Sequence, residues 1–191
     1  MDIIKILTSL SGKNPAFKQL SQSVNSEPEK VEKTVQLGIP MLMEALNRNT
    51  NTSQGAQDLA NALEKHKDDK VDDLAGFLQN VDTEDGTKIL QHIFANKNKT
   101  VQSNLSKTTG LNQNQVGSIL AKIAPLLLGA LGNQKKEQNL DANGISNLTS
   151  SLSQNLHQAG GGSLFSMATK LLDTNKNGSI LDEIMNFFGR R

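Results

Sequence analysis

The side chains best placed to do chemistry lie in the segment 173–184. Asp173, Asn175 and Asn177 occupy alternate positions, and Gly178 follows them. This is the first half of the calcium-loop pattern D-x-[DN]-x-[DN]-G, in which alternate residues direct oxygens at one centre and the glycine permits a sharp turn. The backbone carbonyl of Ser179 can add a ligand. The spacing therefore predicts a candidate calcium site.

The second half of this segment departs from the pattern. Such loops place a bidentate Glu at position twelve, which here is Ile184, and Asp182 and Glu183 are the neighbouring carboxylates. A shortened loop closed by Asp182 would bind calcium weakly, because two of its first three ligands are neutral Asn. A capped turn without an ion is the alternative, since Asp, Asn and Gly are also preferred turn residues. The candidate metal ligands are Asp173, Asn175, Asn177, Ser179 and Asp182.

The other reactive residue types show no spacing typical of a catalytic or metal site. His66, His92 and His157 are far apart in the sequence, and each is more simply interpreted as a surface or hydrogen-bonded histidine. The chain has no Cys, which excludes disulfides and thiolate chemistry. Phosphate-binding loops and nucleophile elbows are absent from the sequence. The sequence therefore predicts a protein that is not an enzyme.

Charge is unevenly distributed, although the net charge is only +1. The segment 86–136 contains lysines and no acidic residue, whereas 64–85 is rich in carboxylates. Such asymmetry is typical of a nucleic-acid face, but it also fits two oppositely charged surfaces of one protein. Aromatic residues make up 3% of the chain and that segment has no Arg, so base stacking and bidentate base contacts have little support. We therefore expect nucleic-acid binding only as an alternative, through Lys88, Lys97, Lys99, Lys107, Lys122, Lys135 and Lys136.

Targeting signals are not evident in the sequence. The N-terminus lacks a basic region followed by an apolar stretch and a cleavage site. The most apolar run, 123–132, is about half of the ~20 residues that a membrane span requires. We expect no membrane span and a cytoplasmic location.

Helix-forming residues dominate the elements that must position these side chains, and alternation of β-branched residues is nearly absent. Asn14 and Pro15 predict a helix start, and Ser26 to Glu29 reads as a capping box with Pro28 in the first turn. Gly110 predicts a left-handed helix end and Asn112, with Gln115, the next helix start. We expect further helix starts at Asp82 and Asp141, and short helices over 71–78 and 164–172.

An internal repeat underlies this pattern. Shifting the chain by 85 positions aligns 20–46 with 105–131, with identities at Leu20/Leu105, Ser21/Ser106, Val31/Val116, Pro40/Pro125, Leu42/Leu127, Ala45/Ala130 and Leu46/Leu131. Because an interior proline removes a backbone hydrogen bond, Pro40 and Pro125 predict either a bend or a break between shorter helices. Gly129 and Gly132 predict close approach of a neighbouring helix.

These patterns predict an all-α fold: an internally duplicated helical bundle of two four-helix units, followed by a short C-terminal helix-loop-helix module. The predicted divisions are 1–80 for the first repeat with a short connecting helix, 81–159 for the second repeat, and 160–191 for a glycine linker and the C-terminal module. Three consecutive glycines, 160–162, mark the last boundary.

Several of these segments together resemble the YidB-like bacterial family of unknown function (domain of unknown function 937). The resemblance rests on 86–94, on Thr109 to Asn112, on 123–132 and on 173–184. It implies an all-helical fold with no assigned activity.

We therefore expect a non-catalytic helical scaffold or protein-interaction protein with an unknown protein partner. The alternatives are a weak calcium-binding protein, with the tail loop as its site, and a nucleic-acid-binding protein that uses the Lys-rich second repeat. Calcium is the one cofactor that the sequence suggests.

Overall fold

The computed structural model describes residues 15–159 and 163–172. Over these residues the secondary structure is helical and contains no strand, which confirms the predicted all-α class. The helices are α2 (Pro15–Ser23), α3 (Pro28–Asn49), α4 (Ser53–His66), α5 (Leu74–Asn80), α6 (Thr83–Phe94), α7 (Asn98–Thr109), α8 (Gln113–Gln138), α9 (Ala142–Ala159) and α10 (Ser163–Leu172), and a 3-10 turn η1 (Ala95–Lys97) joins α6 to α7.

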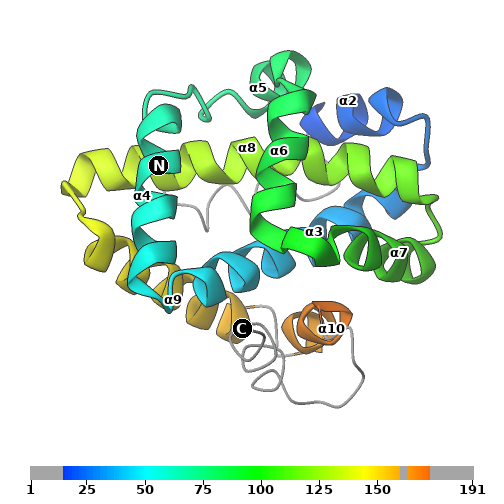
Figure 1. Ribbon diagram of the computed structural model, residues 1–191. Helices are drawn as coiled ribbons and strands as arrows, with labels where there is room; N and C mark the ends of the chain where they lie inside the picture. Colours follow the sequence, from blue (N-terminus) through cyan, green and yellow to red (C-terminus); the bar gives the residue numbers. More distant parts are fainter. Residues whose placement is uncertain (1–14, 160–162, 173–191) are drawn as a thin grey trace.

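Helix α8 is the centre of the fold. It packs against α3, α4, α5, α6 and α7, and Figure 1 shows α4 and α6 crossing it. Its residues are buried almost continuously from Ile119 to Gly132. A helix that is apolar on all sides is stable only where other helices surround it, and α8 is in that position.

Helix α8 also has the length and composition of a membrane span. Among the described residues it is the one helix that does, with a mean hydropathy of 1.5 over its most apolar stretch. In this fold, 78% of that stretch is buried against the protein itself. Its role as the core helix accounts for its apolar sequence.

Both interior prolines lie within continuous helices. Pro40 is inside α3 and Pro125 is inside α8, so the predicted alternative of a break between two shorter helices is wrong. Each proline removes one backbone donor, but packing of the apolar faces on both sides holds the helix together. The two long helices pack against each other, and their buried residues belong to one continuous core.

Local signals located most of the helix ends. Gly110 ends α7 with φ of 77°, and Asn112 and Gln115 form a complete capping box at the start of α8. Asp82 caps α6, and the Asp141 carboxylate accepts from the backbone N–H of Gly144 in the first turn of α9. These positions confirm the predicted starts and ends.

Two predicted helix starts are wrong in detail. The capping residue of α3 is Glu27, which makes no side-chain capping bond, so the capping box expected from Ser26 does not form. Pro28 starts that helix because its fixed φ suits the first turn. The short helix expected over 71–78 begins instead at Leu74, because the Asp73 side chain accepts from the backbone N–H of Gly76.

Glycines set the distance between α8 and the helices that cross it. A Cβ on Gly132 would lie 2.9 Å from the backbone carbonyl of Leu63 in α4, which confirms the predicted close approach at this position. A Cβ on Gly129 would lie 2.7 Å from a Val71 methyl. At the crossing of α6, a Cβ on Gly86 would lie 1.8 Å from the Ala121 carbonyl oxygen of α8. Backbone therefore packs directly on backbone at both crossings.

The last two described helices cover α3. Helix α9 packs on α3 and α4, and α10 packs mainly on α3 with further contacts to α7 and α9. Ala168 and Leu172 of α10 are buried, and the Asn104 amide of α7 donates to the Leu171 carbonyl at 3.0 Å. The part of the predicted C-terminal module that the structure describes therefore contributes to the same core.

Candidate functional site

A shallow pocket of about 280 Å³ lies where α3, α9 and α10 meet. Helix α9 contributes most of its lining, because positions one turn apart along that helix face the same way. Figure 1 shows α9 and α10 on the side of α3 away from α6. The lining residues are Glu44, Ser153, Gln154, His157, Gln158 and Phe165.

Glu44 is the carboxylate of this pocket, and both of its oxygens are occupied. Its Oε1 accepts from Nε of Arg48 at 2.9 Å, and its Oε2 accepts from the Ser153 hydroxyl at 2.9 Å. The Glu44 side chain is only 14% exposed and that of Arg48 18% exposed. Because the second contact joins α3 to α9 across 109 positions, the carboxylate fixes one helix on the other.

His157 and Phe165 form the aromatic side of the pocket. Their ring centroids lie 4.9 Å apart with an interplanar angle of 83°, an edge-to-face contact between α9 and α10. His157 is exposed and Phe165 half-buried, so both rings border the opening. The contact gives the pocket an apolar wall with a polar imidazole at its rim.

A row of hydroxyl contacts continues from the pocket along α9. The Thr50 and Thr149 hydroxyl oxygens lie 2.8 Å apart, and the Ser146 hydroxyl donates to the Thr50 carbonyl at 3.0 Å. Ser146, Thr149 and Ser153 are spaced three and four apart, which places them on one helix face. We call this row, with its partners Thr50 and Glu44, the hydroxyl seam.

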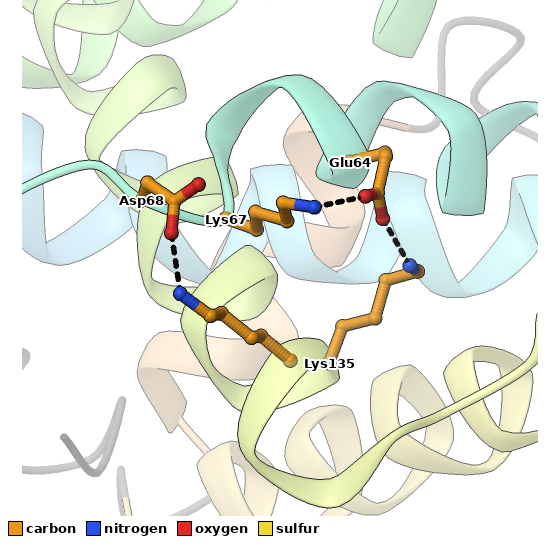
Figure 2. A network of polar contacts seen from close by, with 5 residues as sticks. Glu64, Lys67, Asp68 and Lys135 are labelled. Carbon is orange, nitrogen blue, oxygen red and sulfur yellow. Dashed lines mark hydrogen bonds and ion pairs between the residues drawn. The ribbon is translucent and has the colours of Figure 1, made fainter.

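A second polar cluster joins α4 to the end of α8. Figure 2 shows Glu64 between Lys67 and Lys135, with Asp68 beside them. The Lys135 ammonium is 2.6 Å from Glu64 Oε2, and the Lys136 ammonium is 2.6 Å from Asp68 Oδ1. Lys67 bonds the other Glu64 oxygen. The Lys-rich and acidic segments of the sequence therefore neutralise each other here.

These contacts shift the pKa values of the charged groups. Hydrogen bonds from Lys135 and then Lys67 lower the pKa of Glu64 from 4.5 to about 2, and the hydrogen bond from Lys136 lowers the pKa of Asp68. The Glu64 hydrogen bond raises the pKa of Lys67. Because Glu64 is half exposed, we assign this cluster a modest contribution to stability.

His66 lies between two carboxylates but not in a metal-binding arrangement. Its Nδ1 is 2.9 Å from Asp69 Oδ2, and its Nε2 is 3.7 Å from Asp85 Oδ2. The two carboxylates therefore approach opposite ring nitrogens and do not converge on one centre with the imidazole. Across 15–159 and 163–172, no three His, Asp or Glu side chains are grouped as metal ligands would be.

The calcium ligands expected from the sequence lie outside the described residues. This applies to Asp173, Asn175, Asn177, Ser179 and Asp182 alike. The pocket residues were not singled out by sequence reasoning, which treated His157 as an isolated histidine. The i, i+4 spacing of Ser153 and His157 was visible, but the partner Glu44 is distant in the sequence.

The comparison with protein families identifies the chain. The sequence model of a bacterial protein family of unknown function, DUF937, matches residues 7–134, which is more than half of the 191 residues. The chain belongs to this family. Searches among curated proteins and among solved structures each gave no match.

The DUF937 match divides the fold at the candidate pocket. The matched segment contains α2 to α7 and most of α8, whereas α9 and α10 follow it. Glu44 and Thr50 therefore belong to the DUF937 segment, and the side chains that meet them, Ser153 and Thr149, come from beyond it. The hydroxyl seam is the junction between the DUF937 segment and the two helices that cover it.

Proposed function

We propose that this protein is a non-catalytic helical scaffold that binds a protein partner at the pocket between α3, α9 and α10. The observation that carries the proposal is the hydrogen bonding of the Glu44 carboxylate. Both carboxylate oxygens bond to other side chains of the fold, so the group that would otherwise be the pocket's acid or base serves to hold α9 on α3. The ion pairs of Glu64 and Asp68 likewise connect α4 with α8.

The shallow shape of the pocket supports a protein partner over a small molecule. Small-molecule sites usually enclose about 300–1,000 Å³ and surround most of the ligand. The present pocket, at about 280 Å³, is near the lower end of that range, but it is shallow and open and would leave much of a small molecule in solvent. It fits one apolar side chain projecting from a partner, and the exposed Gln154 and Gln158 amides at its rim can bond to the partner's backbone.

Site-specific photocrosslinking tests this proposal. A benzophenone amino acid at Gln158, on the rim, should capture one defined protein, whereas the same group at the exposed Gln19 of α2 should not. The captured protein is then purified and its binding to the unmodified chain is measured by calorimetry. Phe165→Ala should weaken that binding about tenfold, the effect of losing an anchor of ~1.4 kcal/mol.

The matched control is Phe77→Ala on α5, a half-buried phenylalanine remote from the pocket. It should leave binding unchanged after correction for the folded fraction. Equal capture from Gln158 and Gln19, or equal affinity of the Phe165 and Phe77 variants, would refute a binding site at this pocket.

A nucleic-acid partner has less support than a protein partner. Lys135 and Lys136 bond to Glu64 and Asp68, and the Lys122 ammonium donates to the Leu78 carbonyl at 3.2 Å. At least these three lysines of the segment 86–136 are thus committed to contacts within the chain. A gel shift at low salt would revive this alternative.

We also propose that α2–α3 and α7–α8 are the products of a duplication. Each pair consists of a shorter helix followed by a long one, and the long helices carry Pro40 and Pro125 at aligned positions. Superposition of Pro15–Asn49 on Asn98–Gln138 with the prolines coincident is the test. The cytoplasm remains our proposed location, and cell fractionation tests it.

A further inference from the structure

His66, the last residue of α4, lies between carboxylates from two different parts of the chain. Its Nδ1 is within hydrogen-bond distance of Asp69, at 2.9 Å, whereas its Nε2 lies 3.7 Å from Asp85 of α6, beyond that distance. The imidazole side chain is only 15% exposed, so protein surrounds most of it. One ring therefore makes one complete contact and one incomplete contact with carboxylates.

The contact with Asp69 fixes which imidazole nitrogen carries hydrogen. An ionised carboxylate only accepts hydrogen bonds, so Nδ1 of His66 must be the donor at 2.9 Å. A neutral imidazole has one N–H, so its Nε2 then presents a lone pair to the Asp85 carboxylate and cannot bond to it. A protonated imidazole has an N–H at both nitrogens and carries a positive charge. Protonation of His66 therefore changes its contact with Asp85 from unfavourable to attractive.

Both carboxylates are held in position by α8. Asp69 lies over Gly129, where a Cβ would be 3.3 Å from the Asp69 Oδ2, and the Asn133 amide donates to the Asp69 carbonyl at 3.0 Å. Asp85 directly precedes Gly86, whose backbone packs on α8. The Asp85 side chain is 41% exposed and free to rotate, and a movement of about 1 Å brings it within hydrogen-bond distance of the imidazole.

The other charged groups on the elements around His66 are paired with one another or exposed to solvent. Lys67, Lys135 and Lys136 bond to Glu64 and Asp68, and Arg48 of α3 bonds to Glu44. Helix α9 contains His157, which contacts Phe165, and no Asp, Glu, Lys or Arg. The exposed charged groups of α4, of the segment 67–82 and of the first two turns of α6 are Asp58, Lys65, Lys70, Asp72, Asp73, Asp82, Glu84 and Lys88.

We propose that His66 is a proton-dependent bridge between the end of α4 and the start of α6. When protonated, it bonds to Asp69 and Asp85 together and closes the segment 67–84, which contains α5. Histidine changes charge between about pH 5 and pH 8, so mild acidification forms the bridge. The folded chain then holds this proton more tightly than the unfolded chain, so the stabilisation grows as the pH falls through that range and is lost as the pH rises. Figure 1 shows α5 and α10 on opposite sides of α8, and the bridge does not depend on the pocket beside α10.

Asp85→Asn tests the bridge, and Glu84→Gln is its matched control. Both substitutions remove one negative charge from the first turn of α6, and of the two residues Asp85 is the one that approaches the imidazole. Nitrogen-15 NMR of the ring, assigned with His66→Gln, measures its protonation. At about pH 6.5 the protonated fraction should be smaller in Asp85→Asn than in the wild-type chain, with Glu84→Gln close to wild type.

Stability and hydrogen exchange give two further measurements of the bridge. The melting temperature of the wild-type chain relative to Asp85→Asn should rise by about 1–3 °C between about pH 8 and pH 5.5, as expected for a partly exposed ion pair in a chain of this size. Protection of the α5 amides should rise about two- to fivefold more in the wild-type chain over the same interval. Equal protonated fractions in the wild-type chain and Asp85→Asn, an equal response of Glu84→Gln, or a melting-temperature difference that is independent of pH would overturn the bridge.

Discussion

The hydroxyl oxygens of Thr50 and Thr149 lie 2.8 Å apart in the buried contact between the end of α3 and the middle of α9. Each hydroxyl also lies within hydrogen-bond distance of a carbonyl in its own helix, Asn47 for Thr50 and Ser146 for Thr149. The two hydroxyl hydrogens can therefore satisfy two of these three contacts at a time. The pair holds α9 through a shared network that neither residue supplies alone.

Removing both of these hydroxyls together should cost less unfolding free energy than the sum of the costs of removing each one alone. Thr149→Val keeps the shape and leaves Thr50 without its buried partner, which should cost about 1 kcal/mol of unfolding free energy. Because either single substitution already removes the contact between the two hydroxyls, the double variant with Thr50→Val should be less destabilised than the sum of the two single variants. Denaturant unfolding of the four proteins measures the coupling. Strict additivity would show that the hydroxyls do not interact.

Gly86→Ala should separate α6 from α8. The added Cβ would lie 1.8 Å from the backbone carbonyl oxygen of Ala121, and neither backbone can move without disturbing the core. Overpacking of this kind costs about 1–3 kcal/mol, and a contact with backbone belongs at or above the upper end. Thermal and denaturant unfolding should both report the loss.

Gly117→Ala is the matched control for that substitution. Gly117 lies in α8, and its added Cβ would lie 3.2 Å from the side-chain oxygen of Gln102, which can move aside. Alanine stabilises a helix interior by about 0.5–1 kcal/mol relative to glycine, so this variant should be neutral or slightly more stable. Equal destabilisation by both substitutions would contradict the proposed backbone contact.

Glu64→Gln should reduce stability at neutral pH and have little effect in strong acid. The folded pKa of Glu64 is lowered to about 2 from 4.5, so the carboxylate stabilises the fold above pH 4.5, and this contribution is lost as the pH falls toward 2. The difference in unfolding midpoint between the wild-type chain and the variant should therefore shrink as the pH falls from 4.5 to about 2. Added salt should narrow the gap at pH 7, since the cluster is exposed.

A comparison with Glu29→Gln controls for general charge effects, because Glu29 lies in the first turn of α3, away from the ion-pair cluster. A gap for Glu64→Gln that stays constant from pH 7 to pH 2 would show that its ion pairs with Lys135 and Lys67 contribute nothing to folding.

Calcium should bind no tighter than the millimolar range. Among the proposed ligands only Asp173 and Asp182 are carboxylates, and fewer charged ligands mean weaker binding. Calorimetry of the whole chain and of Asp173→Ala measures this, together with the change in melting temperature on adding the ion. Saturation at micromolar calcium would contradict the weak-site prediction, and identical traces for the two proteins would indicate a capped turn without an ion.

The parts of this fold that were predictable from sequence are those decided by neighbouring residues. The left-handed end at Gly110 and the capping box of Asn112 with Gln115 depend on bonds within four positions. The all-helical class followed from composition and from periodicity summed over whole segments. The family resemblance came from motifs in segments that the match at 7–134 largely covers.

The side-chain contacts that could not be predicted from the sequence join segments that are distant along the chain. Glu44 and Ser153 meet across 109 positions, and Lys135 and Glu64 across 71, so no local pattern announces either pair. The sequence left open whether Pro40 and Pro125 bend or break their helices. Both α3 and α8 are continuous, because packing of the long helices outweighs the loss of one backbone bond each. Gly86 within a helical pattern is a sequence signal of the close packing between α6 and α8.

The central place of α8 has a consequence for synthesis of the chain. Helices α3, α4 and α6 are all made before α8, yet each of them packs its apolar face on it. At roughly 5–20 residues per second, on the order of ten seconds separate the translation of α3 from that of α8. During that interval the nascent helices have no core to join, so the ribosome-bound chain should attract chaperones until residue 138 leaves the exit tunnel.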